Sequence, residues 1–212
     1  MEIHNIKHPL IEQKVTELRD KNTKSPDFRK LVDDIVTLLT YEATRSIIVD
    51  KKAVDTPLTK FDGVRIAEPY PVIIPILRAG LGMLDGIERL LPEAEIGFLG
   101  MKRDEETLEA YTYANRLPRI LKGRQCFLLD PMLATGHTLV AAVEYLVERG
   151  AKDIVSVNIL AAPEGIKCVE DSISPDVSLK VFTAAIDSHL NEKGYIVPGL
   201  GDAGDRLYGV VG

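Results

Sequence analysis

The sequence predicts an α/β fold with a central, mostly parallel sheet flanked by helices. Short apolar runs alternate along the chain with segments whose apolar residues recur at helical spacing, which is typical of parallel sheets with right-handed crossovers. Two of the runs, 71–77 and 126–129, are expected to be buried strands. An arginine with glycines follows the first, and an acid with a small-residue loop follows the second. Ligands bind at that edge of open parallel sheets.

Length and composition narrow the class of protein. The 212 residues fit one domain spanning 1–212, and 45% hydrophobic with 27% charged residues is ordinary for a soluble globular protein. The net charge of −6 argues against a nucleic-acid partner, although local arginines still permit an anionic substrate. Cys126 and Cys168 lack metal-ligand spacing and indicate no disulfide framework. Without a signal-like start or an apolar run of about 18 residues, we expect a cytoplasmic protein and no membrane partner.

The N-terminal part is expected to cover the core with helices. One helix-like stretch runs to about Asp20, and Ser25 is predicted to cap a second helix with Pro26 in its first turn. The apolar face of this second helix continues to Ile47. Residues 50–70 are rich in Lys, Asp, Pro and Gly and resemble edge structure.

Arg78 and Gly80 follow the buried strand 71–77, and a helix is expected over 81–91. The planar guanidinium of Arg78 suits bidentate binding of a diphosphate, and Gly80 permits a close backbone approach. Pairing of Arg78 with a surface carboxylate is the alternative.

Basic residues also follow the next predicted strand, 95–99. A ligand role is favoured for Arg103, whereas 104–109 is expected to be a solvated loop. Beyond it, Tyr111 and Tyr113 alternate as in a hairpin. We therefore predict that about 100–120 forms a flexible or oligomer arm.

The stretch 125–140 carries the clearest chemical signal. An apolar strand stops at Asp130-Pro131, and small residues with hydroxyls lead into an amphipathic helix that extends to Val147. A strand, tight loop and helix N-terminus form a phosphate site, because free N–H groups and the helix dipole favour an anion. Neither a P-loop nor a dinucleotide fingerprint is present. An ordinary strand–turn–helix corner is the alternative.

The later segments continue the alternation, with strands expected at 154–161 and 179–184 and a helix ending near 172. Glycines then crowd the stretch 187–206. Such density suits backbone that wraps closely around something flat, for example the imide edge of a pyrimidine with Tyr195 or Ile196 over its face. A turn-rich or disordered tail is the alternative.

Five motifs resemble the uracil phosphoribosyltransferase family in the family's order. They lie at 75–82 (PILRAGLG), 100–108 (GMKRDEETL), 130–136 (DPMLATG), 161–165 (AAPEG) and 194–205 (GYIVPGLGDAGD). The resemblance implies a type I phosphoribosyltransferase fold with a β-arm or hairpin and a base-binding hood over about 187–212. It also implies conversion of uracil and 5-phosphoribosyl 1-diphosphate (PRPP) to UMP and diphosphate in pyrimidine salvage. Mg²⁺ bound mainly through the PRPP diphosphate, a homodimer or homotetramer, and a possible GTP effector belong to the same expectation.

The resemblance also implies roles for individual residues. Arg103, Asp130 and Asp202 are the expected catalytic residues, and no protein ligand to the metal is expected. PRPP is expected to be held by Arg78, Arg103, Asp130, Pro131, Met132, Leu133, Ala134, Thr135, Gly136, His137, Thr138 and Asp202. Uracil is expected to be held by Tyr195, Ile196, Gly201, Asp202 and Ala203.

Several details distinguish this chain or remain open. Pro131 stands where many type I enzymes have a second acid, which makes direct Mg²⁺ ligation by protein less favourable. His137 replaces a small residue, and we expect it to point outward or to cap the 5′-phosphate. A cis peptide is expected at Arg78-Ala79. The alternatives are a phosphoribosyltransferase for another base, or a regulator that senses PRPP and controls RNA or transcription.

Overall fold

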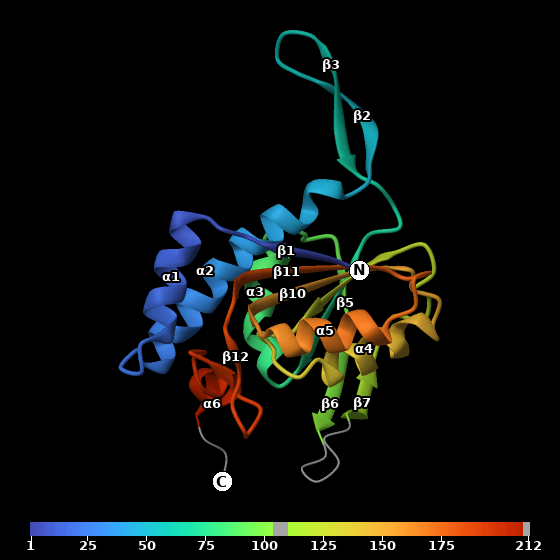
Figure 1. Ribbon diagram of the computed structural model, residues 1–212. Helices are drawn as coiled ribbons and strands as arrows, with labels where there is room; N and C mark the ends of the chain where they lie inside the picture. Colours follow the sequence, from blue (N-terminus) through green and yellow to red (C-terminus); the bar gives the residue numbers. More distant parts are fainter. Residues whose placement is uncertain (104–109, 210–212) are drawn as a thin grey trace.

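The computed structural model describes residues 1–103 and 110–209 (Figure 1). A nine-stranded sheet forms its centre, and every pairing in it is parallel except that of β6 with β7. The main path runs β1 (Glu2–Asn5), β11 (Ser178–Ile186), β10 (Asp153–Ala161), β8 (Gln125–Leu129), β4 (Val72–Leu77), β6 (Phe98–Arg103) and β7 (Ala110–Arg116). The short strands β5 (Glu95–Ile96) and β9 (Met132–Leu133) pair with β4 and β10. The predicted α/β fold with a mostly parallel sheet is confirmed.

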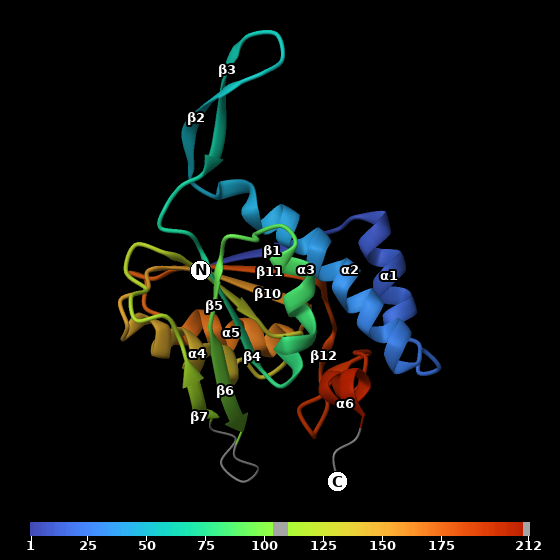
Figure 2. The ribbon, with the colours of Figure 1, turned by 180° about the vertical axis from the view of Figure 1, so that it is seen from behind.

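Helices cover both faces of this sheet. Phe127 and Leu129 of β8 join the apolar cluster beneath α1 (Pro9–Arg19), α2 (Ser25–Ala43) and α3 (Leu84–Glu88). The intervening Cys126 and Leu128 join the cluster beneath α4 (His137–Val147) and α5 (Pro163–Ser172). Because side chains alternate between the faces of a strand, a strand buried on both faces is continuously apolar, as observed. Figure 2 shows α1, α2 and α3 on the side opposite α4 and α5.

Helix boundaries differ from the prediction in two places. Lys24 is the N-cap of α2, so Ser25 is its first residue and does not cap it. The helix predicted over 81–91 is a 3₁₀ turn, η2 (Ala79–Met83), followed by the short α3, because glycines weaken helical structure in this segment. Across residues 1–103 and 110–209, none of the helices is both long and apolar enough to cross a membrane.

A hairpin projects from the body of the molecule (Figures 1 and 2). It consists of antiparallel β2 (Val49–Asp55) and β3 (Lys60–Ile66), which follow the 3₁₀ turn η1 (Thr44–Ser46). From the sequence we predicted edge structure at 50–70 and a flexible or oligomer arm at about 100–120. Within that second range, β6 and β7 pair as a hairpin that extends the main sheet, as the Tyr111 and Tyr113 alternation indicated. Residues 104–109, the predicted solvated loop, lie outside the described residues.

The glycine-rich C-terminal stretch is ordered across 187–209 and docks against the N-terminal helices. β12 (His189–Leu190) and β13 (Ile196–Val197) pair antiparallel, and α6 (Ala203–Tyr208) packs against α2 and η2. The guanidinium of Arg206 donates to the carbonyl oxygens of Leu18 (2.7 Å), Leu200 (3.1 Å), Asp20 (2.6 Å) and Thr23 (3.3 Å). It also lies 4.5 Å from the ring centroid of Phe28. These contacts hold the C-terminal stretch at the carboxyl edge of the sheet.

Candidate active site

Two adjoining cavities lie at the carboxyl edge of the sheet. One, of about 250 Å³, is lined by Arg78, Ala79, Asp130, Pro131, Met132, Asp202, Ala203 and Gly204. The other, of about 270 Å³, is lined by Met132, Ala134, Lys193, Gly194, Tyr195, Ile196, Gly201, Asp202 and Ala203. We call them the donor cavity and the base cavity. Met132, Asp202 and Ala203 border both, so the structure brings together residues from three separate sequence motifs.

Asp130 lies at the end of β8 and faces the donor cavity. Burial raises the pKa of its carboxyl to about 6, although the Met132 amide donates to Oδ1 at 3.4 Å and opposes the shift. Its backbone carbonyl accepts a 2.7 Å hydrogen bond from Asn158 Nδ2. Ser156 Oγ in turn donates to Asn158 Oδ1 at 2.8 Å, and both residues are fully buried. We did not predict this pair from the sequence, where its signal is the presence of two polar residues within the apolar run of β10.

The loop between Asp130 and α4 has free amide groups at a helix N-terminus. Gly136 is the N-cap of α4 with φ +88°, and because glycine has no side chain, no side-chain oxygen caps the helix. Thr135 and Thr138 are half-buried, and β9 pairs the middle of the loop with β10. His137 is exposed, and its predicted role, pointing outward or capping the 5′-phosphate, stays a prediction. The local geometry is that of an anion site.

Arg78 follows β4 and borders the donor cavity. The cis peptide bond is Leu77-Arg78, so the expectation of one at Arg78-Ala79 is wrong by one residue. Within residues 1–103 and 110–209, no carboxylate forms an ion pair with Arg78, which disfavours the alternative of a surface salt bridge. The close approach that Gly80 permits is made by the protein's own backbone, because a Cβ on Gly80 would overlap the Leu129 carbonyl of β8.

Arg103 is the last residue of β6, where its backbone pairs with Ala110. β6 is parallel to β4, so Arg103 ends at the same edge of the sheet as Arg78. Its side chain lies outside the described part of the chain, and its ligand role stays a prediction.

The predicted base-binding residues all line the base cavity. Ile196 is buried, whereas Tyr195 is 44% exposed. The turn between β12 and β13 is fixed by Asn191 Oδ1, which accepts from the amides of Lys193 and Tyr195 at 3.0 Å each. Asp202 Oδ1 caps α6 by accepting from the Asp205 amide at 2.8 Å. The structure adds Met132, Ala134, Lys193 and Gly194 to this lining.

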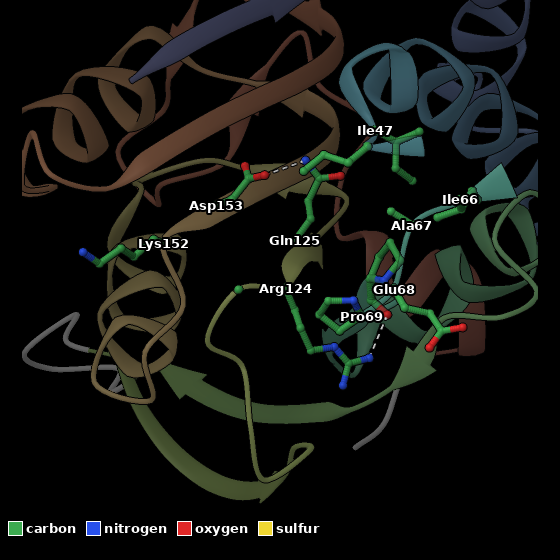
Figure 3. A pocket seen from close by; sticks show the side chains of 12 residues that line it. Ile47, Ile66, Ala67, Glu68, Pro69, Arg124, Gln125, Lys152 and Asp153 are labelled. Atoms are coloured by element: carbon green, nitrogen blue, oxygen red, sulfur yellow. Dashed lines mark hydrogen bonds between the residues drawn. The ribbon is translucent and has the colours of Figure 1, made fainter. Parts of the chain in front are cut away.

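A further cavity, of about 240 Å³, opens at the opposite edge of the sheet, where β8 and β10 begin (Figure 3). Some of its polar groups are hydrogen-bonded to protein, whereas Gln125 Oε1 and Asp153 Oδ1 are buried without a hydrogen-bond partner in the described part of the chain. Arg124 donates to the carbonyls of Tyr70 and Pro71 and to Glu95, and Gln125 donates to Asp153 at 2.9 Å. None of the predicted site residues lines it, so we assign the ligand site to the carboxyl edge.

Taken together, a cation and two carboxylates face one cavity, the loop from Asp130 leads on to the N-terminus of α4, and a glycine-rich hood encloses the neighbouring cavity. Such a site can hold a sugar phosphate beside a small planar molecule. The fold agrees with this reading. The chain is similar to hypoxanthine phosphoribosyltransferase from Trypanosoma cruzi, with a TM-score of 0.51 at 12% identity over 76% of this chain and 75% of that one. The fold is that of the type I phosphoribosyltransferases.

The particular family follows from closer comparisons. The family model for uracil phosphoribosyltransferase matches residues 5–210. Proteins named uracil phosphoribosyltransferase from Bifidobacterium longum subsp. infantis and Beutenbergia cavernae are 62% and 61% identical, each over 100% of both chains. The AQ2163 protein from Aquifex aeolicus has a TM-score of 0.92 at 43% identity, over 98% of each chain. The chain belongs to the uracil phosphoribosyltransferase family and is an enzyme of that family.

Proposed function

We propose that the protein transfers the 5-phosphoribosyl group of PRPP to uracil, giving UMP and diphosphate in pyrimidine salvage. The observation that carries this proposal is the shared border of the two cavities. Met132, Asp202 and Ala203 separate a cavity suited to a sugar phosphate from one suited to a flat base. In the reaction, the bond from C1′ to the diphosphate oxygen breaks, N1 of uracil bonds to C1′, and the N1 proton is lost.

Groups at the donor cavity provide most of the electrostatic stabilisation of the transition state. Positive charge builds on the ribose as the diphosphate departs, as in glycoside cleavage. Arg78 stabilises the departing diphosphate, and the amides before α4 hold the 5′-phosphate. Asp130 accepts hydrogen bonds from the ribose hydroxyls while its carboxylate is ionised. Arg103 is proposed to act on the diphosphate side with Arg78.

The base cavity mainly positions uracil. Backbone groups of 201–203 pair with the imide edge, and Ile196 and Tyr195 cover the ring. Holding N1 against C1′ supplies up to about 7–11 kcal/mol of the barrier reduction. Asp202 borders both cavities, so it is the residue best placed near the N1 proton. We assign no dedicated general base.

Mg²⁺ fits this site as an ion carried by the substrate. Asp130 and Asp202 are the carboxylates on the donor cavity. Among residues 1–103 and 110–209, no cluster of three or more His, Cys, Asp or Glu side chains could hold a metal ion by itself. This donor set suits a hard cation bound mainly by diphosphate oxygens and waters, with the two carboxylates nearby. When bound, the ion neutralises charge on the leaving diphosphate.

A homodimer or homotetramer is also part of the proposal. Val54, Leu58, Phe61 and Val64 of the β2–β3 hairpin are exposed, and Leu58 is 95% exposed. An exposed apolar hairpin of this kind suits contact with another copy. The family resemblance supports GTP as an effector, and the sequence composition favours a cytoplasmic location.

Diphosphate release with PRPP, Mg²⁺ and a panel of uracil, cytosine, hypoxanthine and orotate tests the reaction. We expect release with uracil and formation of UMP, and no release from the Asp130→Ala variant, which controls for contaminating enzymes. Release with another base would overturn the account of the base cavity while leaving the donor cavity in place. PRPP binding without release from any base would support a regulator instead.

A further inference from the structure

A buried ion pair lies directly behind the base cavity without lining it. Asp187 follows β11 and is 9% exposed. Arg19, the last residue of α1, donates to both of its carboxylate oxygens, Nη1 to Oδ2 at 2.7 Å and Nη2 to Oδ1 at 2.5 Å. Such a bidentate pair fixes both partners in position.

The same pair holds both polar groups of one residue in the hood. The Gly199 amide donates to Asp187 Oδ2 at 2.9 Å, and the Gly199 carbonyl accepts from Arg19 Nη1 at 2.8 Å. Gly199 has φ +60°, and a Cβ there would overlap the Ile196 carbonyl. Because Gly199 has no side chain to anchor the turn, these two backbone contacts fix its position, together with the hydrogen bond of Arg206 to the neighbouring Leu200 carbonyl.

The turn at Gly199 joins the two walls of the base cavity. Tyr195 and Ile196 precede it, and the segment 201–203 follows it. Neither Arg19 nor Asp187 lines either active-site cavity. A displacement of Gly199 therefore changes the spacing between the wall over the ring and the wall at its edge, while Arg78 and Asp130 stay fixed by the sheet.

We infer that Arg19 and Asp187 are positioning residues that set the width of the base cavity through Gly199. This inference rests on the proposed uracil activity. Loss of either partner is expected to weaken binding of uracil more than binding of PRPP, because Arg78 and Asp130 lie on the sheet and only the 202–204 side of the donor cavity moves with the hood. A loss of binding that is equal in the ground state and the transition state raises KM without lowering kcat.

The test uses Arg19→Met, Asp187→Asn and the double variant, with KM for each substrate, kcat and thermal midpoint as readouts. The matched control is Asp34→Asn, which breaks the 2.7 Å ion pair of Asp34 on α2 with Lys14, a residue of α1 like Arg19; neither Asp34 nor Lys14 lines an active-site cavity. We expect kcat/KM for uracil to fall about tenfold or more in each single variant, mainly through a higher KM, since small misplacements in a substrate site cost up to about 10²-fold. KM for PRPP should rise clearly less than KM for uracil, and the control should match the parent protein.

The double variant separates positioning from stability. Each single change leaves a buried charge without its partner, whereas the double change removes both charges. We expect the thermal midpoint to recover in the double variant while KM for uracil stays high. Recovery of both, equal shifts in the two KM values, or an unchanged KM for uracil would overturn the inference.

Calorimetric titration with UMP tests the positioning role of Arg19 and Asp187 independently of the proposed reaction. If the parent protein turns over another base and not uracil, the proposed function fails, and the variants are then measured with that base. If no base turns over, weaker UMP binding in the single variants than in the Asp34→Asn control supports positioning. Equal UMP binding rejects it.

Discussion

Gly136 and Gly165 meet backbone to backbone where the phosphate loop crosses the start of α5. A Cβ on Gly136 would lie 2.6 Å from the Gly165 carbonyl oxygen and 2.9 Å from Cys168 Cβ. A Cβ on Gly165 would overlap the carbonyl of Ala134 in the same loop. The loop that precedes α4 is therefore held from behind by α5, and each glycine is required by the other segment's backbone.

Gly136→Ala should displace the phosphate loop. We expect KM for PRPP to rise by roughly tenfold or more, because a small shift of the amides at the N-terminus of α4 weakens phosphate binding. Gly123→Ala is the matched control. Gly123 also has a positive φ, +77°, but a Cβ there meets nothing within 4 Å. Both variants bear the strain of a left-handed alanine, about 1–2 kcal/mol, so equal KM values would contradict the prediction.

Donor use should depend on pH through Asp130. Below its pKa of about 6 the carboxyl is protonated and can no longer accept two ribose hydrogen bonds as an anion. We expect kcat/KM for PRPP to fall about tenfold per pH unit below about 6. In Asp130→Asn this step should vanish from the pH profile, on a much lower plateau. Persistence of the step in the variant would assign it to another group.

The ionised carboxylate of Asp130 should also lower the free energy of unfolding at neutral pH. An acid whose folded-state pKa is raised favours folding at low pH, and this contribution is lost as pH rises from about 4 through about 6. Asp130→Asn should therefore be more stable than the parent at pH 8, by roughly 1–3 kcal/mol, and no more stable at pH 4. Urea unfolding at the two pH values measures the difference. A variant less stable at pH 8 would show that the carboxylate is compensated in the fold.

Asn158→Ala should loosen the end of β8. The change removes the hydrogen bond to the Asp130 carbonyl and leaves buried Ser156 Oγ without its acceptor. We expect a loss of about 2–4 kcal/mol in the free energy of unfolding and a higher KM for PRPP. Asn22→Ala is the control, since its Nδ2 bonds Asp20 on the exposed surface and its loss should cost at most about 0.5 kcal/mol. Similar losses of unfolding free energy in both variants would show that the buried Ser156–Asn158 pair contributes little to stability.

The β2–β3 hairpin should be required for assembly and dispensable for the fold. Phe61→Ser with Val64→Ser removes exposed apolar surface while leaving the hairpin's backbone pairing intact. We expect a smaller particle in light scattering with unchanged helix content, because burial of such groups drives association. Asp62→Ser, also on β3, is the control and should keep the parent's mass. An unchanged mass in the double variant would argue against the hairpin as the contact.

The parts of this structure that the sequence predicted well are those where burial leaves a pattern. β8 and β10 are apolar on both faces, and α4 shows apolar residues at helical spacing, so their places were predictable. The β2–β3 hairpin was missed because every residue of β2 is exposed, and a strand without a buried face shows no alternation. Contacts between distant segments, such as Gly136 with Gly165, leave no local signal at all.

The residues of the candidate site also divide into those that the sequence predicted and those that it did not. Asp130, Arg78 and the base-cavity residues were identified from motifs, because their spacing along the chain is short and regular. Asn158 and Asp187 were missed since they act on backbone groups far away in sequence. The cis bond before Arg78 was misplaced by one residue because nothing in the residue types distinguishes the two peptides.

The shared border of the two cavities has a kinetic consequence. Met132, Asp202 and Ala203 touch both spaces, so a nucleotide made of base, ribose and phosphate fills the two cavities at once. Such a product blocks the entry of either substrate from a single bound position. We therefore expect the product to compete with both substrates, so that accumulated nucleotide slows its own synthesis.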